Sequence, residues 1–453
     1  MIVMKFGGSS VADAPSIERV VNIIRGYLPQ HPVIVVSAMS KTTRKLLRAA
    51  ELAAGGDLAA GTTQLEELKA YHMEVIRGLR ATAVESEVDG YFNEIERLLS
   101  GLAILREFTP RGRDRIAAYG ELISSKILVE ALRRAGVNAR WLDARQFIIT
   151  DDDHTRARPL FDMANPKIVH ALRPCLEAGQ IPVTQGYIGS TIDGITTTLG
   201  FEGSDYTAAI IGAALDAQDI QIWTDVNGIM TADPALLPEA RTVKILSFAE
   251  AKELTHFGAK VLHPKTLFPA HEKAIPVHIY NSKQPDAPGT VIALEAPPAR
   301  TPVKSLAYKK PISLVTIISN GSLPRLRFFK LVFDALERAG LFAYIAAISE
   351  LRVALAVDSS EMTQALINQL RHAAQTMVTH NHAIVCLVGE RLKQRPGIVA
   401  DVFQALNDMR FDLISQGASE HSLALIVHEA NLETALKRLH ELLFQNPDPA
   451  LFY

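Results

Sequence analysis

The first part of the chain alternates two hydrophobic patterns. Up to residue 295, short runs of β-branched and other apolar residues alternate with longer stretches in which apolar positions recur every three or four residues. The short runs predict strands at Ile2–Phe6, Val33–Val36, Ala139–Leu142, Ile181–Gln185, Ile220–Thr224 and Val277–Tyr280. The longer stretches predict helices, for example Ser16–Leu28, Arg115–Ala135, Ala164–Glu177, Tyr206–Leu215 and Phe248–His256. Because the predicted strands are apolar throughout, we expect an α/β fold with a mostly parallel sheet covered by helices on both faces.

Two segments break this alternation. Residues 62–108 keep the helical period without any strand signal, and they predict two long helices outside the sheet. Residues 295–302 read Glu-Ala-Pro-Pro-Ala-Arg-Thr-Pro, a proline content typical of a linker. The linker bounds a first domain, residues 1–295.

An internal repeat occupies the region after residue 310. Val332–Leu336, Val-Phe-Asp-Ala-Leu, recurs seventy positions later as Val402–Leu406, Val-Phe-Gln-Ala-Leu. Three more pairs match at this offset: Ser349-Glu350 with Ser419-Glu420, Ala354-Leu355 with Ala424-Leu425, and the predicted strands Leu314–Ile318 with Ile384–Val388. Agreement at one offset predicts a duplicated module containing a βαβ unit rather than chance similarity between two αβ stretches.

Composition and charge exclude several function classes. The 453 residues are 48% hydrophobic and 21% charged, the mix of a globular protein with more than one core. A net charge of −2 provides no basic field for nucleic acid. Cys175 and Cys386 lie too far apart in sequence to suggest a metal cluster or a disulfide framework. Lys5 interrupts the apolar N-terminal stretch, so we expect no signal peptide, no membrane partner and a cytoplasmic protein.

The first cluster with candidate chemistry is Lys5-Phe6-Gly7-Gly8-Ser9-Ser10, at the end of the first predicted strand. Glycines permit close backbone approach, so successive N–H groups can point into one concavity that suits a phosphate. Lys5 would add a mobile cation. The alternative is a plain strand–turn with a surface lysine, since the stretch is not a Walker A motif.

A second cluster spans residues 194–208, Gly-Ile-Thr-Thr-Thr-Leu-Gly-Phe-Glu-Gly-Ser-Asp-Tyr-Thr-Ala. Ser204 or Asp205 can N-cap the apolar helix that follows, and glycines just before a helix leave its terminal N–H groups accessible to an anion. Ordinary capping explains Ser204 or Asp205 but not the glycines and the run of three threonines. The cluster therefore predicts an anion site.

Two further stretches carry turn-forming and charged residues. Residues 223–234, Trp-Thr-Asp-Val-Asn-Gly-Ile-Met-Thr-Ala-Asp-Pro, follow a predicted strand, and ligands of open α/β sheets bind at the carboxyl ends of strands. Residues 257–264, Phe-Gly-Ala-Lys-Val-Leu-His-Pro, pair a glycine with Lys260 at a helix end. Pro264 and the apolar neighbours favour a packed turn over a catalytic role for His263.

Together these stretches resemble the aspartokinases of the amino acid kinase family. The matching motifs are Lys-Phe-Gly-Gly-Ser-Ser-Val at 5–11, Gly120-Glu121-Leu122, Gly203-Ser204-Asp205, Trp223-Thr224-Asp225-Val226 and residues 258–264. The resemblance covers essentially the whole chain, because the repeat is similar to the tandem ACT domains of these enzymes. It implies a kinase domain at residues 1–295 and two α+β ACT modules of βαββαβ order at residues 310–380 and 381–453.

The resemblance also implies roles for individual residues. Lys5 and Lys260 would neutralise the transferring phosphate, and Asp205 would hold the lysines in place. Nucleotide and phosphate contacts would come from Gly7, Gly8, Ser9, Ser204, Thr224, Asp225 and Lys260. Glu121 would bind the substrate's α-ammonium, and Thr43 would help to hold aspartate. Such a site works by positioning and charge stabilisation.

Cofactors and partners follow from the same resemblance. The cofactors would be ATP and Mg²⁺, with Mg²⁺ held mainly through the phosphates and no metal site of the protein's own. The β-carboxylate of L-aspartate would be the nucleophile. The ACT modules would take an amino-acid effector and form a homodimer, and they disfavour a kinase for glutamate or carbamate.

Several positions depart from the family pattern. Phe201 stands at the family's substrate arginine, Met230 at its nucleotide-site tyrosine and Ala235 at another arginine. Lys41 and Arg44 replace a usual glycine and a usual asparagine beside Thr43. In the first ACT module, Tyr344 occupies the position of an aspartate in lysine-sensitive relatives. Candidate replacements for the lost arginine are Lys41, Arg44, Arg156 and Arg158, with Lys41 and Arg44 favoured, although both could equally be solvated loop charges.

Two functions are compatible with these departures. The first is an active aspartokinase that makes 4-phospho-L-aspartate for lysine, threonine and methionine biosynthesis. The second is a catalytically weakened relative that binds nucleotide or amino acid as a regulatory subunit. A coupled ADP-release assay with L-aspartate and MgATP separates them.

Overall fold

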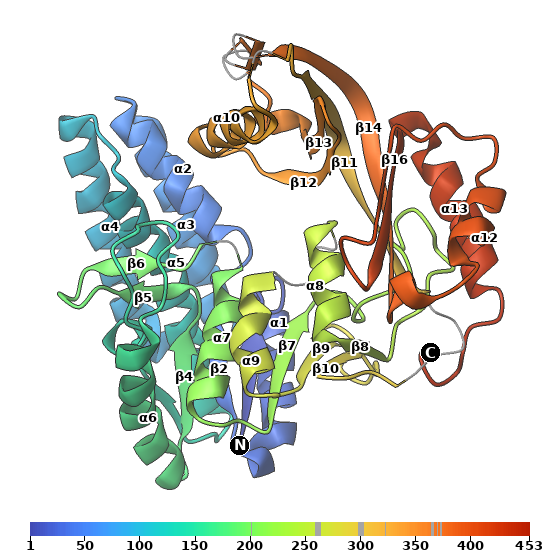
Figure 1. Ribbon diagram of the computed structural model, residues 1–453. Helices are drawn as coiled ribbons and strands as arrows, with labels where there is room; N and C mark the ends of the chain where they lie inside the picture. Colours follow the sequence, from blue (N-terminus) through green and yellow to red (C-terminus); the bar gives the residue numbers. More distant parts are fainter. Residues whose placement is uncertain are drawn as a thin grey trace. The chain divides into compact units, whose positions relative to one another are not determined.

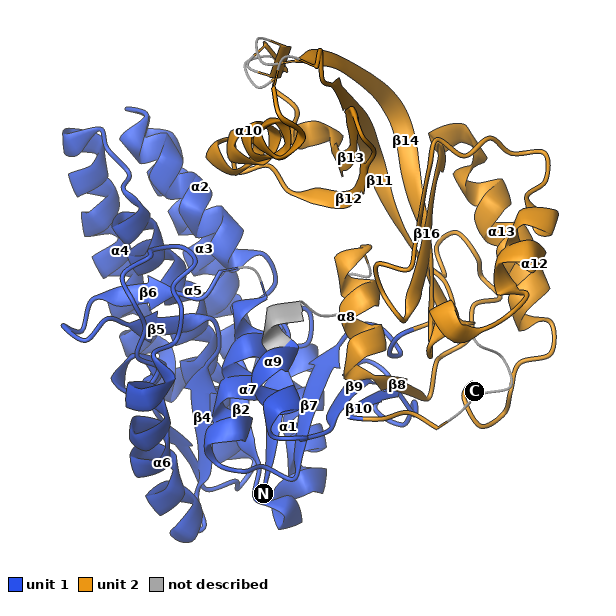
Figure 2. Ribbon diagram, in the orientation of Figure 1, with its two compact units in different colours: residues 1–229, 262–294 blue, residues 230–261, 295–453 orange. Residues whose placement is uncertain are grey.

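The chain folds into two compact units (Figure 2). The computed structural model describes residues 1–200, 202–258, 264–297, 303–321, 323–363, 367–368, 370–371 and 374–453. Unit 1 comprises Met1–Ile229 and Leu262–Leu294, and unit 2 comprises Met230–Val261 and Glu295–Tyr453. Each unit has its own sheet and its own core.

The sheet of unit 1 is mostly parallel. Its strands are β1 (Ile2–Phe6), β2 (Val33–Val36), β3 (Ala139–Trp141), β4 (Ile181–Gln185), β7 (Asp219–Thr224), β9 (Val277–Asn281) and β10 (Thr290–Ala293), in the order β3-β4-β2-β1-β7-β9-β10. Every pairing is parallel except that of β9 with β10. The predicted strands are confirmed, and none differs by more than one residue at an end. The strands are apolar throughout because helices cover both faces of the sheet.

Helices form the outer layers of unit 1. Those nearest the sheet are α1 (Ala14–Tyr27), α5 (Pro110–Arg134), α6 (Phe161–Glu177), α7 (Gly203–Ala214) and α9 (Pro264–Glu272). Figure 1 shows α6, α7 and α9 on one face of the sheet, with α1 and α5 behind. Predicted helices begin a few residues too late where polar capping residues and prolines precede the apolar stripe. In α5, for example, Thr109 accepts a hydrogen bond from the Gly112 amide and Pro110 opens the first turn.

The helices outside the sheet are also confirmed. Residues 62–108 contain most of α3 (Leu58–Gly78) and all of α4 (Glu85–Leu105), which pack with α2 (Thr42–Ala54). A short hairpin, β5 (Ile188–Ser190) and β6 (Thr196–Thr198), stands apart from the main sheet and leads into α7.

Unit 2 is built around one antiparallel sheet in the order β12-β13-β11-β14-β16-β15. Its elements are β11 (Val303–Ile318), α10 (Arg325–Arg338), β12 (Ala343–Ile348), β13 (Arg352–Asp358), β14 (Gln375–Gly389), α12 (Ile398–Ala405), β15 (Leu413–Gln416), β16 (Ser422–His428) and α13 (Leu432–Phe444). β13 and β16 begin seventy residues apart, as do β12 and β15. The repeat found in the sequence is thus a repeat of structural elements.

The central strands of unit 2 are longer than the sequence predicted. Leu314–Ile318 and Ile384–Val388 are only parts of β11 and β14, which run 16 and 15 residues. The polar stretch Tyr308–Pro311 interrupts the apolar pattern of β11, and the pairing with β14 shifts register there. Because of such polar residues, the sequence pattern predicted only a part of each strand.

An additional helix of unit 2, α8 (Phe248–His256), is anchored by a buried ion pair. Ser247 and Glu250 form a capping box at its start. Lys304 on β11 places its Nζ 2.8 Å from Glu250 Oε2, and both side chains are 0% exposed. Since breaking such a pair leaves an uncompensated charge in the core, the pair holds α8 against the sheet. Across the described residues of both units, no helix is long and apolar enough to cross a membrane.

Candidate active site

The glycine turn after β1 brings several backbone groups together at the carboxyl ends of the parallel strands. The Gly7 amide donates to Trp223 O at the end of β7 (3.0 Å), and the Ser40 amide donates to Gly8 O (2.9 Å). A side chain at Gly8 would lie 2.7 Å from Ala38 O, so the turn fits against the segment that follows β2 only with glycine. The turn thus lies where ligands of open α/β sheets bind.

Lys5 and Asp205 form a buried ion pair in this region. Lys5 Nζ lies 2.5 Å from Asp205 Oδ1, and the residues are 8% and 6% exposed. Lys5 belongs to β1 and Asp205 to the first turn of α7, so the pair joins the centre of the sheet to a helix start. The alternative of a surface lysine is therefore wrong.

The expectation that Ser204 or Asp205 caps α7 is also wrong. The N-cap residue is Glu202, which takes a left-handed conformation (φ 54°, ψ 27°) and makes no side-chain cap bond. Ser204 and Asp205 both lie inside the first turn and are buried. Capping therefore does not account for Asp205, whose carboxylate instead faces Lys5.

Glu202 adds a second carboxyl to this pair and was missed by the sequence analysis. Its Oε2 is buried and has no hydrogen-bond partner among the described residues. Burial and the nearby Asp205 raise the pKa of Glu202 to about 7, while Lys5 opposes the shift. The available signal was an acidic residue between Gly200 and Gly203, three positions before Asp205.

Glu121 on α5 and Thr43 at the start of α2 lie close together. Glu121 on α5 is fully enclosed; its Oε1 accepts from the Ala38 amide (3.2 Å), and its Oε2 has no partner among the described residues. A methyl group at Gly120 would lie 3.0 Å from Thr43 Oγ1, which places Thr43 against this turn of α5. Burial raises the pKa of Glu121 to about 8, and bonds from Ala38 and Thr43 oppose the shift.

Lys41 and Arg44 are solvent-exposed at the start of α2. Lys41 is the N-cap residue and makes no side-chain cap bond. Thr42, between Lys41 and the substrate candidate Thr43, is buried and donates to Met39 O (2.6 Å). The α2 start thus places Thr43 beside Glu121 but leaves both flanking charges in solvent.

Thr224 and Asp225 follow β7 beside two other strand ends. Ser282, after β9, donates to Thr224 O (2.9 Å), and its hydroxyl lies 2.7 Å from Ser10 Oγ. Thr224 Oγ1 donates to Asp225 Oδ1 (3.4 Å). These bonds hold the ends of β1, β7 and β9 together.

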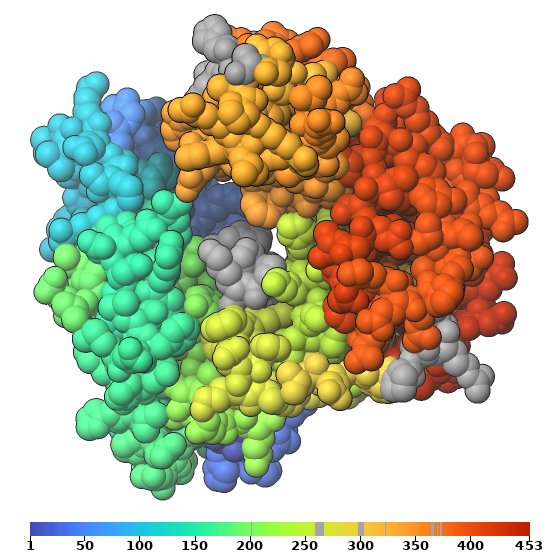
Figure 3. Space-filling view, in the orientation of Figure 1, coloured from blue at the N-terminus to red at the C-terminus, as the bar shows by residue number. Residues whose placement is uncertain are grey.

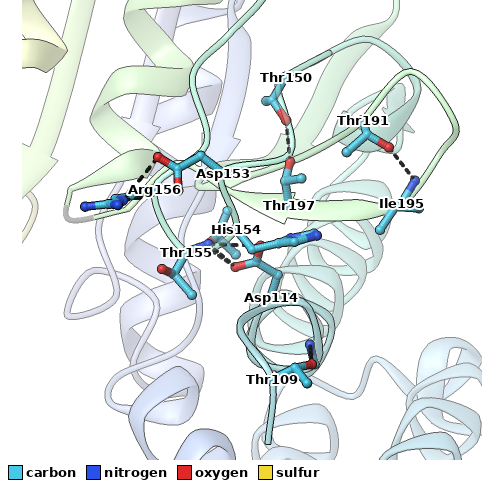
Figure 4. Close-up of polar contacts among 12 residues, drawn as sticks. Thr109, Asp114, Thr150, Asp153, His154, Thr155, Arg156, Thr191, Ile195 and Thr197 are labelled. Carbon is cyan, nitrogen blue, oxygen red and sulfur yellow. Dashed lines mark hydrogen bonds and ion pairs between the residues drawn. The ribbon is translucent and has the colours of Figure 1, made fainter.

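A second polar centre, also missed by the sequence analysis, lies at Asp114 in the first turns of α5 (Figure 4). The Asp114 carboxylate accepts from His154 Nδ1 (2.6 Å), the Thr155 amide (3.0 Å) and Thr198 Oγ1 (2.6 Å). It is 1% exposed. It therefore ties the 151–158 loop to β6, which leads into Gly200.

Comparison with known proteins identifies the family. The amino acid kinase family model matches residues 1–281, and an ACT domain model matches residues 385–443. Lysine-sensitive aspartokinase 3 of Escherichia coli is 36% identical over 462 residues, covering 98% of this chain and 99% of its own length. Aspartokinase 1 of Arabidopsis thaliana, a chloroplastic protein, is 35% identical over 98% of this chain and 80% of its own length. The chain belongs to the aspartokinases.

Solved structures agree with this assignment. The crystal structure of E. coli aspartokinase III in complex with aspartate and ADP, in the R-state, has a TM-score of 0.88 at 34% identity and covers 98% of this chain and 100% of its own. The T-state of the same aspartokinase, in complex with lysine and aspartate, has a TM-score of 0.84. The aspartokinase fold is therefore confirmed. The alternative of a catalytically weakened relative that acts as a regulatory subunit gains no support from these comparisons.

Five of the family positions named from the sequence lie outside the described part of unit 1. Lys260, His263 and Phe201 lie outside the described residues. Met230 and Ala235 belong to unit 2. Within the described residues of this aspartokinase, no group of three or more His, Cys, Asp or Glu side chains could hold a metal ion by itself.

Proposed function

We propose that this aspartokinase transfers the γ-phosphoryl group of ATP to the β-carboxylate of L-aspartate, giving 4-phospho-L-aspartate and ADP, as the first step of lysine, threonine and methionine biosynthesis in the cytoplasm. The observation that carries the proposal is the buried Lys5–Asp205 pair beside the glycine turn. A buried cation next to close-packed backbone amides is suited to the negative charge of a transferring phosphoryl group.

The phosphate side of the site is formed by β1 and α7. Lys5 neutralises the equatorial oxygens in the transition state, and Gly7, Gly8 and Ser9 donate to the phosphates. Asp205 holds the Lys5 ammonium, which lies 2.5 Å away, in the position that the phosphoryl group requires. Lys260 supplies a second cation, Ser204 contributes at the α7 start, and Thr224 and Asp225 contact the nucleotide.

The substrate side is formed by α5 and the α2 start. Glu121 Oε2, which is buried and without a partner among the described residues, accepts from the α-ammonium of aspartate. Thr43 lies against the preceding residue, Gly120, and contacts the same substrate. The β-carboxylate then attacks the γ-phosphorus, and the bond to the bridging oxygen of ADP breaks. A carboxylate is already a nucleophile, so no strong general base is required.

Mg²⁺ would fit beside the carboxyl groups of Glu202 and Asp205. Glu202 Oε2 lacks a hydrogen-bond partner among the described residues, and Asp205 lies near enough to raise the pKa of Glu202. Mg²⁺ is commonly held by one or two carboxylates plus substrate phosphates, so Glu202 and Asp205 would assist the phosphates in holding it. When bound, Mg²⁺ supplies positive charge to the phosphate oxygens.

The test is a coupled ADP-release assay with L-aspartate and MgATP. Aspartate-dependent ADP release is expected, with hydroxylamine trapping of the acyl phosphate confirming the product. ATP hydrolysis that does not respond to aspartate would contradict the proposal.

The ACT modules provide regulation and assembly. Residues 310–453 form most of a homodimer contact and bind a small amino acid. Lysine is disfavoured as the effector, because Tyr344 replaces a carboxylate and its ring already has the Lys309 ammonium 5.1 Å from its centroid. Calorimetry with lysine tests this point: micromolar binding would contradict it.

A further inference from the structure

The α-carboxylate of the proposed substrate has no cationic partner among the residues assigned so far. Aspartate has an α-carboxylate in addition to the β-carboxylate that reacts, and a carboxylate taken out of water is costly unless it is paired. Lys5 is already paired with Asp205, and Lys260 is assigned to the phosphate side. Glu121 and Glu202 are acidic. A further cation must therefore reach the substrate, and this inference rests on the proposed function.

Of the four basic residues considered from the sequence, Arg156 has its backbone packed beside the segment that leads into α7. A side chain at Gly200 (φ 84°) would lie 3.3 Å from Thr155 O and 3.5 Å from Arg156 Cα. The Gly203 amide donates to Gly200 O (3.1 Å), so Gly200 is connected directly to the first turn of α7 and hence to Asp205. Lys41 and Arg44, at the start of α2, are exposed as Arg156 is, but their side chains make no hydrogen bond or ion pair among the described residues that would orient them.

The loop that carries Arg156 is fixed at several points. Asp114 binds His154 and the Thr155 amide, as Figure 4 shows. The Ala157 amide donates to Thr198 O on β6 (2.9 Å), and the Asp151 amide donates to Arg158 O (3.0 Å). The residues on both sides of Arg156 are thus held through their backbone amides. An anchored backbone lowers the entropy lost when the guanidinium binds a ligand.

The Arg156 side chain is oriented while its outer nitrogens stay accessible. Its Nε lies 3.2 Å from Asp153 Oδ1 and 3.1 Å from Asp153 Oδ2, and the side chain is 79% exposed. Among the described residues, the two terminal nitrogens make no hydrogen bond or ion pair. The segment around residues 150–177 lies on the surface of unit 1 in the view of Figure 3, in teal and green. A solvated guanidinium held through Nε can still offer paired N–H groups to a carboxylate.

We infer that Arg156 binds the α-carboxylate of aspartate and thereby selects an α-amino dicarboxylic acid over analogues that lack this charge. Asp114 is a positioning residue that holds the loop, and Asp153 orients the guanidinium.

The test compares L-aspartate with isoasparagine, its α-amide, in wild type and in Arg156→Ala. Dissociation constants come from calorimetry in the presence of MgADP, and KM and kcat from the ADP-release assay. Arg156→Ala should weaken aspartate binding and raise its KM at least ~10-fold, the effect of losing about 1.4 kcal/mol of interaction. Isoasparagine binding and the KM for ATP should change less than ~3-fold, and Arg156→Lys should recover part of the loss.

Arg158→Ala is the matched control, because Arg158 is exposed on the same loop and its amide is bound by Asp151 (2.8 Å). It should leave the preference for aspartate over isoasparagine unchanged. An Arg156→Ala variant with an unchanged preference would overturn the inference, and so would loss of the preference in Lys41→Ala or Arg44→Ala instead. Absence of aspartate-dependent turnover in wild type contradicts the proposed function, and the calorimetric comparison still decides the role of Arg156 in that case.

Discussion

Replacing Glu121 by glutamine should stabilise the protein in a pH-dependent way. Burial raises the pKa of Glu121 from 4.5 to about 8 in the folded chain. Between these values, the unfolded chain loses the proton while the folded chain keeps it. Wild-type stability therefore falls as pH rises from about 4.5 to 8, by an amount set by the shift. At about 1.4 kcal/mol per pKa unit, the full effect is on the order of 5 kcal/mol.

The Glu121→Gln variant has no such titration, and its Oε1 can still accept from the Ala38 amide. Its melting temperature should match wild type near pH 5 and exceed it above pH 8 by roughly 10–20 °C, since roughly 2–4 °C accompany each kcal/mol in a domain of this size. Glu66→Gln, at an exposed site on α3, serves as the control and should show no pH-dependent difference. A Glu121→Gln difference that stays constant from pH 5 to pH 9 would refute the reasoning.

The same variant separates stability from function. If Glu121 binds the α-ammonium of aspartate, binding must ionise the carboxyl, so aspartate should release close to one proton per site at pH 7. Calorimetry in buffers of different ionisation enthalpy measures this release. Glu121→Gln should abolish the release and raise the aspartate KM at least ~10-fold. A stabilised variant with normal aspartate KM would assign Glu121 to the core rather than to the substrate.

The remaining predictions concern the phosphate side, the Asp114 centre and assembly. Lys5→Ala should lower kcat by ~10²-fold or more with a small effect on aspartate KM; unchanged turnover would remove Lys5 from the mechanism. Asp205→Asn keeps the size of the side chain but leaves Lys5 without its counter-charge, so kcat should fall similarly, and calorimetric MgADP affinity should show whether the nucleotide is still bound. Asp114→Ala deprives three donors of their acceptor and should lower stability by several kcal/mol, whereas Asp114→Asn keeps an acceptor for Thr198 and should cost less; equal melting temperatures would contradict this. A chain without residues 310–453 should elute as a monomer, and a tight dimer would contradict assembly through the ACT modules.

Local pattern determined much of this protein from sequence alone. The strands of unit 1 could be predicted to within a residue because each is a short apolar run between turn-forming residues, and the local sequence is sufficient to define it. A phosphate site at Lys5 and the glycines after it could be predicted for the same reason: strand end, turn and charge are neighbours in the chain. The repeat in unit 2 was visible because its elements recur at a constant offset.

Tertiary structure alone decided which side chains meet. Asp205 could be taken for a helix cap until the fold placed Lys5 against it, and Asp114 acquires its role from Thr198, 84 residues away. The pKa values of Glu121 and Glu202 depend on burial by several elements, which no local pattern encodes. Residues distant in sequence interact here through desolvation and charge, and these act through space. Local pattern therefore predicted the elements, and their packing determined the chemistry of the site.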